Sequence, residues 1–175
     1  LTAQVDESHA AGDTGIAHTR WATHGVPCER NAHPHISAGL AVVHNGIIEN
    51  HESLRGRLKA LGYQFTSDTD TEVVAHLIAH ELKTTPDFLS AVRQAIAQLQ
   101  GAYAIAVLRA SDPSRLVVAR EGAPLLLGLS DDACYAASDA SALVQVTRRM
   151  VYLENGDCAE LMRSSYRITR VDGTP

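Results

Sequence analysis

The feature that most restricts the fold is a run of short apolar segments in the second half of the chain. Turn sequences rich in Gly, Pro, Asp, Asn and Ser separate the segments, as in Ser111-Asp112-Pro113-Ser114 and Glu154-Asn155-Gly156-Asp157. This spacing is typical of strands joined by tight connections, so the sequence predicts an antiparallel sheet from Gly101 onward. The predicted strands cover 102–108, 116–119, 125–129, 134–137, 150–153, 159–162 and 166–169.

Helical periodicity occupies the middle of the chain. A first helix is predicted from Asn50, a candidate N-cap, to Gly62, and a short strand follows at 63–66. The acidic and hydroxyl-rich segment Ser67–Glu72 precedes a second helix, and Pro86 opens a third. With further strands expected at 16–21 and 40–46, joined by a turn-rich connection over 26–39, the pattern predicts an α+β sandwich with helices on its outer faces.

Composition limits the possible partners. The chain has 175 residues, 45% hydrophobic and 20% charged, which fits one globular domain covering 1–175. A formal net charge of -5 without basic clusters makes nucleic acid and anionic membranes poor partners. No apolar run approaches the roughly 20 residues of a membrane helix, and the first residues do not resemble a signal peptide. We therefore expect a cytoplasmic protein with a small substrate.

Histidine and cysteine are the candidate metal ligands, and their spacing does not favour a metal site. His76 and His80 lie four apart on a predicted helix, but no Glu follows the first of them as in zinc proteases. His33 and His35 flank Pro34 without a companion ligand. The three cysteines form no CxxC pair. We expect no metal and no cofactor.

The segment His44-Asn45-Gly46 follows an apolar strand and carries a candidate oxyanion hole. A side-chain amide beside a freely turning Gly can direct two N–H donors at a substrate carbonyl oxygen, where they stabilise developing negative charge. The alternative is a hairpin turn, because Asn-Gly between apolar runs is a strong turn signal. The other polar segments favour the first interpretation.

Two further polar segments complete a candidate amino-acid site. Arg20 offers a planar fork for a carboxylate, with Thr23 as an additional donor, although Arg20 in a surface ion pair is the simpler alternative. Asp70 offers an acceptor for an ammonium group, and it points away from Asp68 if the segment is extended. A ligand with a carboxylate, an ammonium and a reactive side-chain carbonyl is an amino acid such as L-glutamine.

Several motifs in this order resemble the glutaminase family of isomerising glutamine:fructose-6-phosphate aminotransferases, which are class II glutamine amidotransferases. The resemblance continues more loosely through Gly101-Ala102-Tyr103 to Val146-Thr147-Arg148-Arg149 and covers nearly the whole chain. The motifs are His18-Thr19-Arg20-Trp21-Ala22-Thr23-His24-Gly25, Asn31-Ala32-His33-Pro34-His35, Val43-His44-Asn45-Gly46-Ile47-Ile48-Glu49-Asn50 and Ser67-Asp68-Thr69-Asp70-Thr71-Glu72-Val73.

This resemblance implies a fold, a reaction and residue roles. The implied fold is a four-layer αββα sandwich of the N-terminal-nucleophile hydrolase type. The implied reaction is hydrolysis of glutamine, with the ammonia passing to a separate isomerase domain that converts fructose 6-phosphate to glucosamine 6-phosphate in a homodimeric protein. The implied roles are Arg20, Thr23 and His24 at the glutamine carboxylate, Asp70 and Gly46 at the amino group, Asn45 and Gly46 at the oxyanion, and Trp21 as a mobile pocket residue.

One departure from the family concerns the nucleophile. The family uses a Cys at the mature N-terminus, whose free α-amine acts as the base, whereas this chain begins with Leu1. Cys28, Cys134 and Cys158 are internal and lack that amine. We therefore expect a domain truncated at its N-terminus, without its first strands or the isomerase half, that does not hydrolyse glutamine alone. A noncatalytic amino-acid-binding or regulatory module, and the glutaminase of a sibling amidotransferase, remain alternatives.

Overall fold

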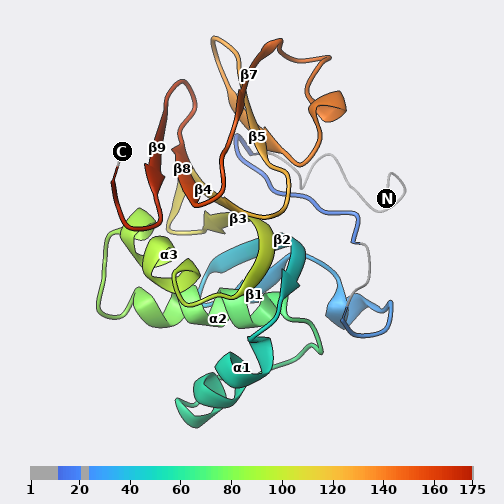
Figure 1. Ribbon diagram of the computed structural model, residues 1–175, viewed down its shortest axis with the longest axis vertical. Helices are drawn as coiled ribbons and strands as arrows, with labels where there is room; N and C mark the ends of the chain where they lie inside the picture. The colour runs from blue at the N-terminus through green and yellow to red at the C-terminus, as the bar shows by residue number, and fades with distance from the viewer. Residues whose placement is uncertain (1–11, 21–23, 175) are drawn as a thin grey trace.

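The chain folds into stacked layers of helices and antiparallel sheets. The computed structural model describes residues 12–20 and 24–174. In Figure 1 the helices lie below a six-stranded sheet, and a three-stranded sheet lies above it. The predicted α+β sandwich is confirmed. Of the four layers that the resemblance implies, the described residues build a helical layer and two sheets.

The larger sheet is antiparallel throughout, with strand order β1-β2-β3-β4-β8-β9. The smaller sheet has β5 between β6 and β7. All seven strands predicted after residue 101 are present, with bounds that differ by a few residues. The strands are β1 (His35–Ser37), β2 (Leu40–Ile48), β3 (Gly101–Arg109), β4 (Asp112–Glu121), β5 (Leu126–Leu129), β6 (Cys134–Ala137), β7 (Arg149–Tyr152), β8 (Asp157–Leu161) and β9 (Tyr166–Arg170).

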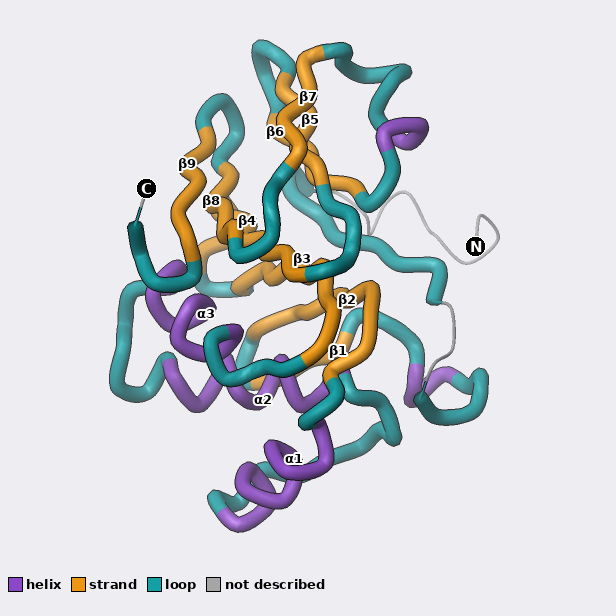
Figure 2. Tube along the Cα trace, in the orientation of Figure 1, coloured by secondary structure: helices purple, strands orange, loops and turns teal. Residues whose placement is uncertain are grey.

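Strand β3 shows why two separate cores form. Successive side chains of a strand point to opposite faces, and both faces of β3 are apolar. Ile105 and Val107 pack toward the helices, whereas Ala104 and Ala106 pack toward the smaller sheet. The helices are α1 (His51–Ala60), α2 (Thr71–Glu81) and α3 (Phe88–Ile96), with short 3-10 turns at Glu29–Asn31 and Ala140–Ala142. Figure 2 shows these helices on one side of the larger sheet.

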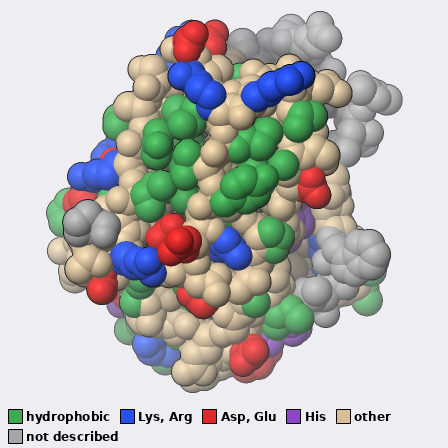
Figure 3. All heavy atoms as spheres, turned by 45° about the horizontal axis from the view of Figure 1, so that its top comes forward, with side chains coloured by type: hydrophobic (Ala, Val, Ile, Leu, Met, Phe, Trp, Pro, Cys, Tyr) green, Lys and Arg blue, Asp and Glu red, His purple; other side chains and the backbone are tan. Residues whose placement is uncertain are grey.

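The face that carries the smaller sheet keeps considerable apolar surface. Figure 3 shows hydrophobic side chains gathered there, with charged groups around them. On this side of the fold, Tyr152, Met162 and Tyr166 are exposed, and all four residues of β6 are only half-buried. The helix side of the larger sheet is covered more completely, since α2 and α3 contribute fully buried residues to its core.

Two predicted strands are absent, and one strand was missed. Residues 16–20 form no strand, and the backbone turns at Arg20 with φ +51°. Residues 63–66 also form no strand, because the N–H of Thr66 donates to the carboxylate of Glu72. The missed strand is β1, whose three residues are too few for a recognisable alternation within the expected turn-rich connection.

Helix caps differ from the sequence prediction in two places. The Asn50 side chain does not cap α1; its amide donates to the Gln98 carbonyl and its oxygen accepts from the N–H of Gln100. In α3 the cap is Asp87, which accepts the N–H of Ser90. No helix among the described residues is long and apolar enough to cross a membrane.

Candidate functional site

Asn45 and Gly46 lie within strand β2 and do not form a hairpin turn. Asn45 is paired with Ala104, Gly46 with Tyr103, and the strand continues to Ile48. The hairpin alternative is therefore wrong. Gly46 has φ +127°, and a Cβ at this position would overlap the carbonyl oxygen of Ala102. Only glycine fits this close approach of two backbones.

Asn45 lines a large cleft between the two sheets. The cleft has a volume of about 1170 Å³, and its lining includes Val43, Cys134 and Leu161. His18 lies on its wall, with its Nε2 atom 2.5 Å from Oδ1 of Asn45. His18 was not among the predicted site residues, although it opens the first of the motifs. Asp70 is not among the residues that line this cleft.

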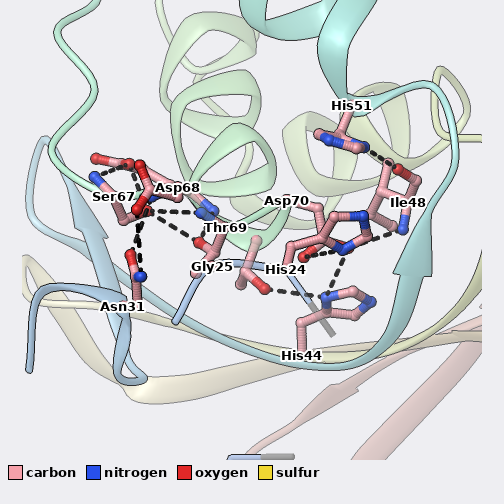
Figure 4. Close-up of polar contacts among 12 residues, drawn as sticks. His24, Gly25, Asn31, His44, Ile48, His51, Ser67, Asp68, Thr69 and Asp70 are labelled. Atoms are coloured by element: carbon pink, nitrogen blue, oxygen red, sulfur yellow. Dashed lines mark hydrogen bonds and ion pairs between the residues drawn. The ribbon is translucent and has the colours of Figure 1, made fainter. Parts of the chain in front are cut away.

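Asp70 lies on the other side of β2, at the start of α2. Its Oδ2 atom accepts the N–H of Ile48 at 2.9 Å, and its side chain does not cap α2. His24 Nδ1 lies 3.8 Å from Oδ1, and His44 Nδ1 lies 3.9 Å from Oδ2, as Figure 4 shows. Asp70 is 3% exposed. One carboxylate oxygen is thus held by the backbone, while the other faces His24.

His44 does not neutralise the charge of Asp70. Burial lowers the pKa of His44 to about 4, against the opposing effect of the Asp70 charge. Its Nδ1 atom lies 3.0 Å from the hydroxyl oxygen of Thr71. The imidazole is neutral at pH 7, so the negative charge of Asp70 remains available to attract a cation.

Arg20 contacts its own loop. Its guanidinium donates to the carbonyls of His24 and Gly25 at 2.9 Å each, and to that of Val26 at 3.2 Å. Both N–H groups of Nη2 are used in this way, so the predicted carboxylate fork is occupied by backbone oxygens. Trp21 and Thr23, two other predicted site residues, lie outside the described residues.

Asn31 joins this loop to the segment before α2. Its side chain is fully buried, donates to the Val26 carbonyl at 3.0 Å and accepts the N–H of Asp68 at 3.0 Å. A Cβ on Gly25 would lie 2.6 Å from Nδ2 of Asn31, so this loop packs tightly on the amide. Figure 4 shows Asn31 facing Asp68 and Ser67. Asn31 was missed as a site-shaping residue, although it begins one of the motifs.

Asp68 and Glu72 lie in the same segment as Asp70 and make separate contacts. Asp68 and Asp70 differ as expected for an extended segment: the Asp68 side chain is 52% exposed and pairs with Arg30, whereas that of Asp70 is 4% exposed. The Glu72 carboxylate accepts the N–H and hydroxyl groups of both Thr66 and Ser67. Burial raises the pKa of Glu72, but neighbouring His76 and these hydrogen bonds outweigh it and hold the pKa well below its ordinary value.

His76, one of the histidines considered as metal ligands, makes hydrogen bonds within the fold through both ring nitrogens. His76 Nδ1 lies 2.8 Å from the Ser37 hydroxyl, and its Nε2 lies 3.0 Å from the Gln64 carbonyl. Across the described residues, no three His, Cys, Asp or Glu side chains are grouped as metal ligands would be.

Two of the three cysteines are not activated as nucleophiles. Cys158 is buried, which raises the pKa of its thiol to about 12. Burial also raises the pKa of Cys134 in β6. A raised pKa keeps both thiols protonated at neutral pH, and the thiolate is the reactive form. Cys28 is exposed.

The fold identifies a class of protein. It is similar to glutamine phosphoribosylpyrophosphate amidotransferase from B. subtilis, with a TM-score of 0.69 and 28% identity over 88% of this chain and 34% of that one. The fold is therefore that of an amidotransferase of the N-terminal-nucleophile type. A model of the glutamine amidotransferase domain matches residues 18–145, and the chain belongs to this family.

Two curated relatives with the same name are more similar in sequence to this chain. The chain is 61% identical over 165 residues to the glutamine–fructose-6-phosphate aminotransferase (isomerizing) of Pseudomonas syringae, covering 94% of this chain and 27% of that protein. It is 54% identical over 175 residues to the enzyme of the same name from Vibrio cholerae, covering 100% of this chain and 29% of that protein. The chain thus spans less than a third of the length of these relatives.

Proposed function

We propose that this chain binds L-glutamine as the glutaminase part of an isomerising glutamine:fructose-6-phosphate aminotransferase. In the complete reaction, the ammonia released from glutamine is used to convert fructose 6-phosphate to glucosamine 6-phosphate on an isomerase domain of a homodimer. The names and 54–61% identities of the curated relatives support this acceptor. The amidotransferase with a different acceptor is only 28% identical, which makes the sibling alternative weaker.

The observation that carries the proposal is the environment of Asp70. A buried carboxylate that is anchored through one oxygen and not neutralised by its neighbouring His44 suits the ammonium of an amino acid. Asn45 and Gly46 lie in β2, the strand that Asp70 contacts at Ile48, and their N–H donors would stabilise the oxygen of the scissile amide. His24, 3.8 Å from Asp70, would lie beside the same end of the substrate.

Arg20 would bind the α-carboxylate by exchanging partners. Its Nη2 donors now hold the His24 and Gly25 carbonyls, so a carboxylate must replace at least one of these contacts to be bound by two parallel hydrogen bonds. Thr23 would add a donor and Trp21 would cover the ligand. In this proposal, substrate binding occurs together with a change of partners at the Arg20 guanidinium.

Cleavage of the amide needs a nucleophile, and the thiols of Cys134 and Cys158, whose pKa values are raised, are unsuited to the task. Cys28 is internal and lacks the adjacent free amine. We place the nucleophile in a part of the protein outside residues 1–175, and we expect the chain to bind glutamine without hydrolysing it. A nucleophile with an adjacent free amine would attack the carboxamide carbon. The oxyanion would then collapse, the amine would pass the proton of the nucleophile to the departing ammonia, and water would hydrolyse the acyl intermediate to glutamate.

Calorimetry with matched ligands tests the binding proposal. L-glutamine is compared with 4-carbamoylbutanoate, which lacks the ammonium, and with L-norvaline, which lacks the carboxamide. We expect L-glutamine to bind, and 4-carbamoylbutanoate to bind about 10-fold more weakly or worse, since a hydrogen bond to a charged group contributes about 1.5–3 kcal/mol. L-norvaline should bind about 5-fold more weakly, since a hydrogen bond to the neutral carboxamide contributes about 1 kcal/mol. Equal binding of all three ligands, or no binding of L-glutamine at millimolar concentration, would refute the proposal. Glutamate release by the chain alone would refute the assignment of the nucleophile.

A further inference from the structure

The contact between His18 and Asn45 joins two segments 27 residues apart at the candidate oxyanion donor. His18 Nε2 lies 2.5 Å from Oδ1 of Asn45, inside the cleft between the two sheets. An Asn side chain can present either its oxygen or its NH₂ group in a given direction, and only the NH₂ group can stabilise an oxyanion. The orientation of the Asn45 amide therefore decides whether the residue can act in catalysis.

The backbone fixes which nitrogen of His18 carries the proton. The N–H of Arg20 donates to Nδ1 of His18 at 2.9 Å. A nitrogen that accepts a hydrogen bond holds a lone pair, so in the neutral ring the proton must be on Nε2. Nε2–H is then a donor, and its partner on Asn45 must be the acceptor oxygen. The NH₂ group of Asn45 is left pointing away from His18, where it can donate to a ligand.

The ring of His18 is also held from the side. Its centroid lies 4.2 Å from that of His33, whose Nε2 lies 3.2 Å from the hydroxyl oxygen of Thr71 at the start of α2. Burial, followed by the charge that His18 and other neighbours would add, lowers the pKa of His33 to about 3. His33 is therefore neutral at pH 7 and packs against His18 without repelling it by charge.

From this chain of contacts we propose that His18 is a positioning residue for amide hydrolysis. The Arg20 N–H fixes the tautomer of His18. In that tautomer, Nε2–H donates to Oδ1 of Asn45 and so holds the Asn45 NH₂ group toward the substrate oxygen. The proposal rests on the proposed glutaminase function, and it adds a role for a residue that contacts neither the ammonium nor the carboxylate of glutamine. Arg20, whose N–H donates to Nδ1 of His18, has a left-handed backbone with φ +51°. This backbone conformation is therefore part of the same arrangement.

Three variants separate the two hydrogen bonds in the complete natural protein that carries this chain. His18→Gln can keep a donor near the position of Nε2, His18→Asn keeps only an acceptor near Nδ1, and His18→Ala keeps neither. Loss of an oxyanion donor costs about 100-fold to 1000-fold in kcat, and we expect misorientation to cost roughly 10-fold or more. We therefore expect His18→Ala and His18→Asn to lower kcat at least about 10-fold with little change in KM, and His18→Gln to restore kcat to within about 3-fold.

A readout that does not depend on activity completes the test. Nitrogen-15 NMR of the histidine rings should show His18 as the Nε2–H tautomer, and the side-chain NH₂ signals of Asn45 should shift on addition of L-glutamine. An Nδ1–H tautomer, or equal kcat values for all three variants, would overturn the positioning role. A wild-type protein that does not hydrolyse glutamine would instead refute the proposed function, so the two failures are distinguishable.

Discussion

Asp70 and Ile48 are joined by a hydrogen bond in which Oδ2 of the carboxylate accepts the backbone N–H at 2.9 Å. This bond joins the N-cap residue of α2 to the last residue of β2. The Asp70 side chain does not cap its own helix. Because the backbone holds one oxygen, the orientation of the other is set before any ligand arrives. Pre-organisation of this kind lowers the entropic cost of binding.

Asp70→Asn should weaken glutamine binding while sparing the fold. The amide oxygen of Asn can still accept the N–H of Ile48, but the charge is lost and an NH₂ donor then faces the site in place of Oδ1. We expect affinity to fall about 10-fold to 100-fold, by the strength of a hydrogen bond to a charged group. Calorimetry measures it, and Asp68→Asn is the control, since that side chain is 52% exposed. Equal losses in both variants would contradict a specific role for Asp70.

Gly46→Ala should destabilise the protein strongly. The residue has φ +127°, and a Cβ would overlap the Ala102 carbonyl oxygen of the adjacent strand. We expect a loss of about 3 kcal/mol or more in the free energy of unfolding, or failure to fold, because both strain and overpacking contribute. The matched control is Gly56→Ala on α1, where a Cβ meets nothing within 4 Å. There we expect a gain of about 0.5–1 kcal/mol from helix propensity. Urea unfolding of the two variants distinguishes these results, which should have opposite sign.

Glu72 should make stability depend on pH in the acid range. The folded chain holds the pKa of Glu72 below its ordinary value of about 4.3, so the stabilisation is complete above that pH. As the pH falls below about 4.3, the unfolded chain takes up a proton that the folded chain does not, and the stabilisation is progressively lost. Glu72→Gln should lower stability by roughly 2 kcal/mol at pH 7, since its NH₂ group cannot accept the donors of Ser67. Urea midpoints of the two proteins should converge as the pH falls toward 3; a constant difference would contradict this account.

The fold could be predicted largely because its signals are local. Each face of β3 carries its own apolar residues, with Ile105 and Val107 on one side and Ala104 and Ala106 on the other. A continuous apolar run is therefore enough to predict this strand. The prediction of a strand at 63–66 was wrong because the Glu72 carboxylate, in the helix that follows, binds the backbone of Thr66. Tertiary contacts override propensity at such positions.

The candidate site could be predicted only in its residue types. Asn45 and Asp70 were selected for their chemistry, but no local pattern shows that they lie on opposite sides of β2, with only Asn45 lining the cleft. Nor could the sequence show that Arg20 would bind loop carbonyls. The carbonyls that accept its hydrogen bonds all lie within six residues of it, in a segment without periodicity. The contact of His18 with Asn45 spans 27 residues and depends on a tautomer. Such relations follow from the packed fold.

Asn31→Ala should loosen the connection between the 24–31 loop and the segment before α2. The fully buried amide donates to the Val26 carbonyl, which also accepts from Arg20, and it accepts the N–H of Asp68, which loses this partner in the variant. We expect a loss of about 1–2 kcal/mol in the free energy of unfolding, from the two hydrogen bonds that the Asn31 amide makes. Hydrogen exchange gives a local readout, because the Asp68 amide should lose protection at once.

The control is Arg30→Ala, which removes an ion pair to the carboxylate of the same aspartate. That pair is formed by side chains that are 60% and 52% exposed, so we expect a change below about 1 kcal/mol and an unchanged Asp68 amide. If the Asp68 amide exchanged equally fast in both variants, the loop would be held by its surface charges, and the buried amide of Asn31 would not be what joins it to the substrate-binding segment.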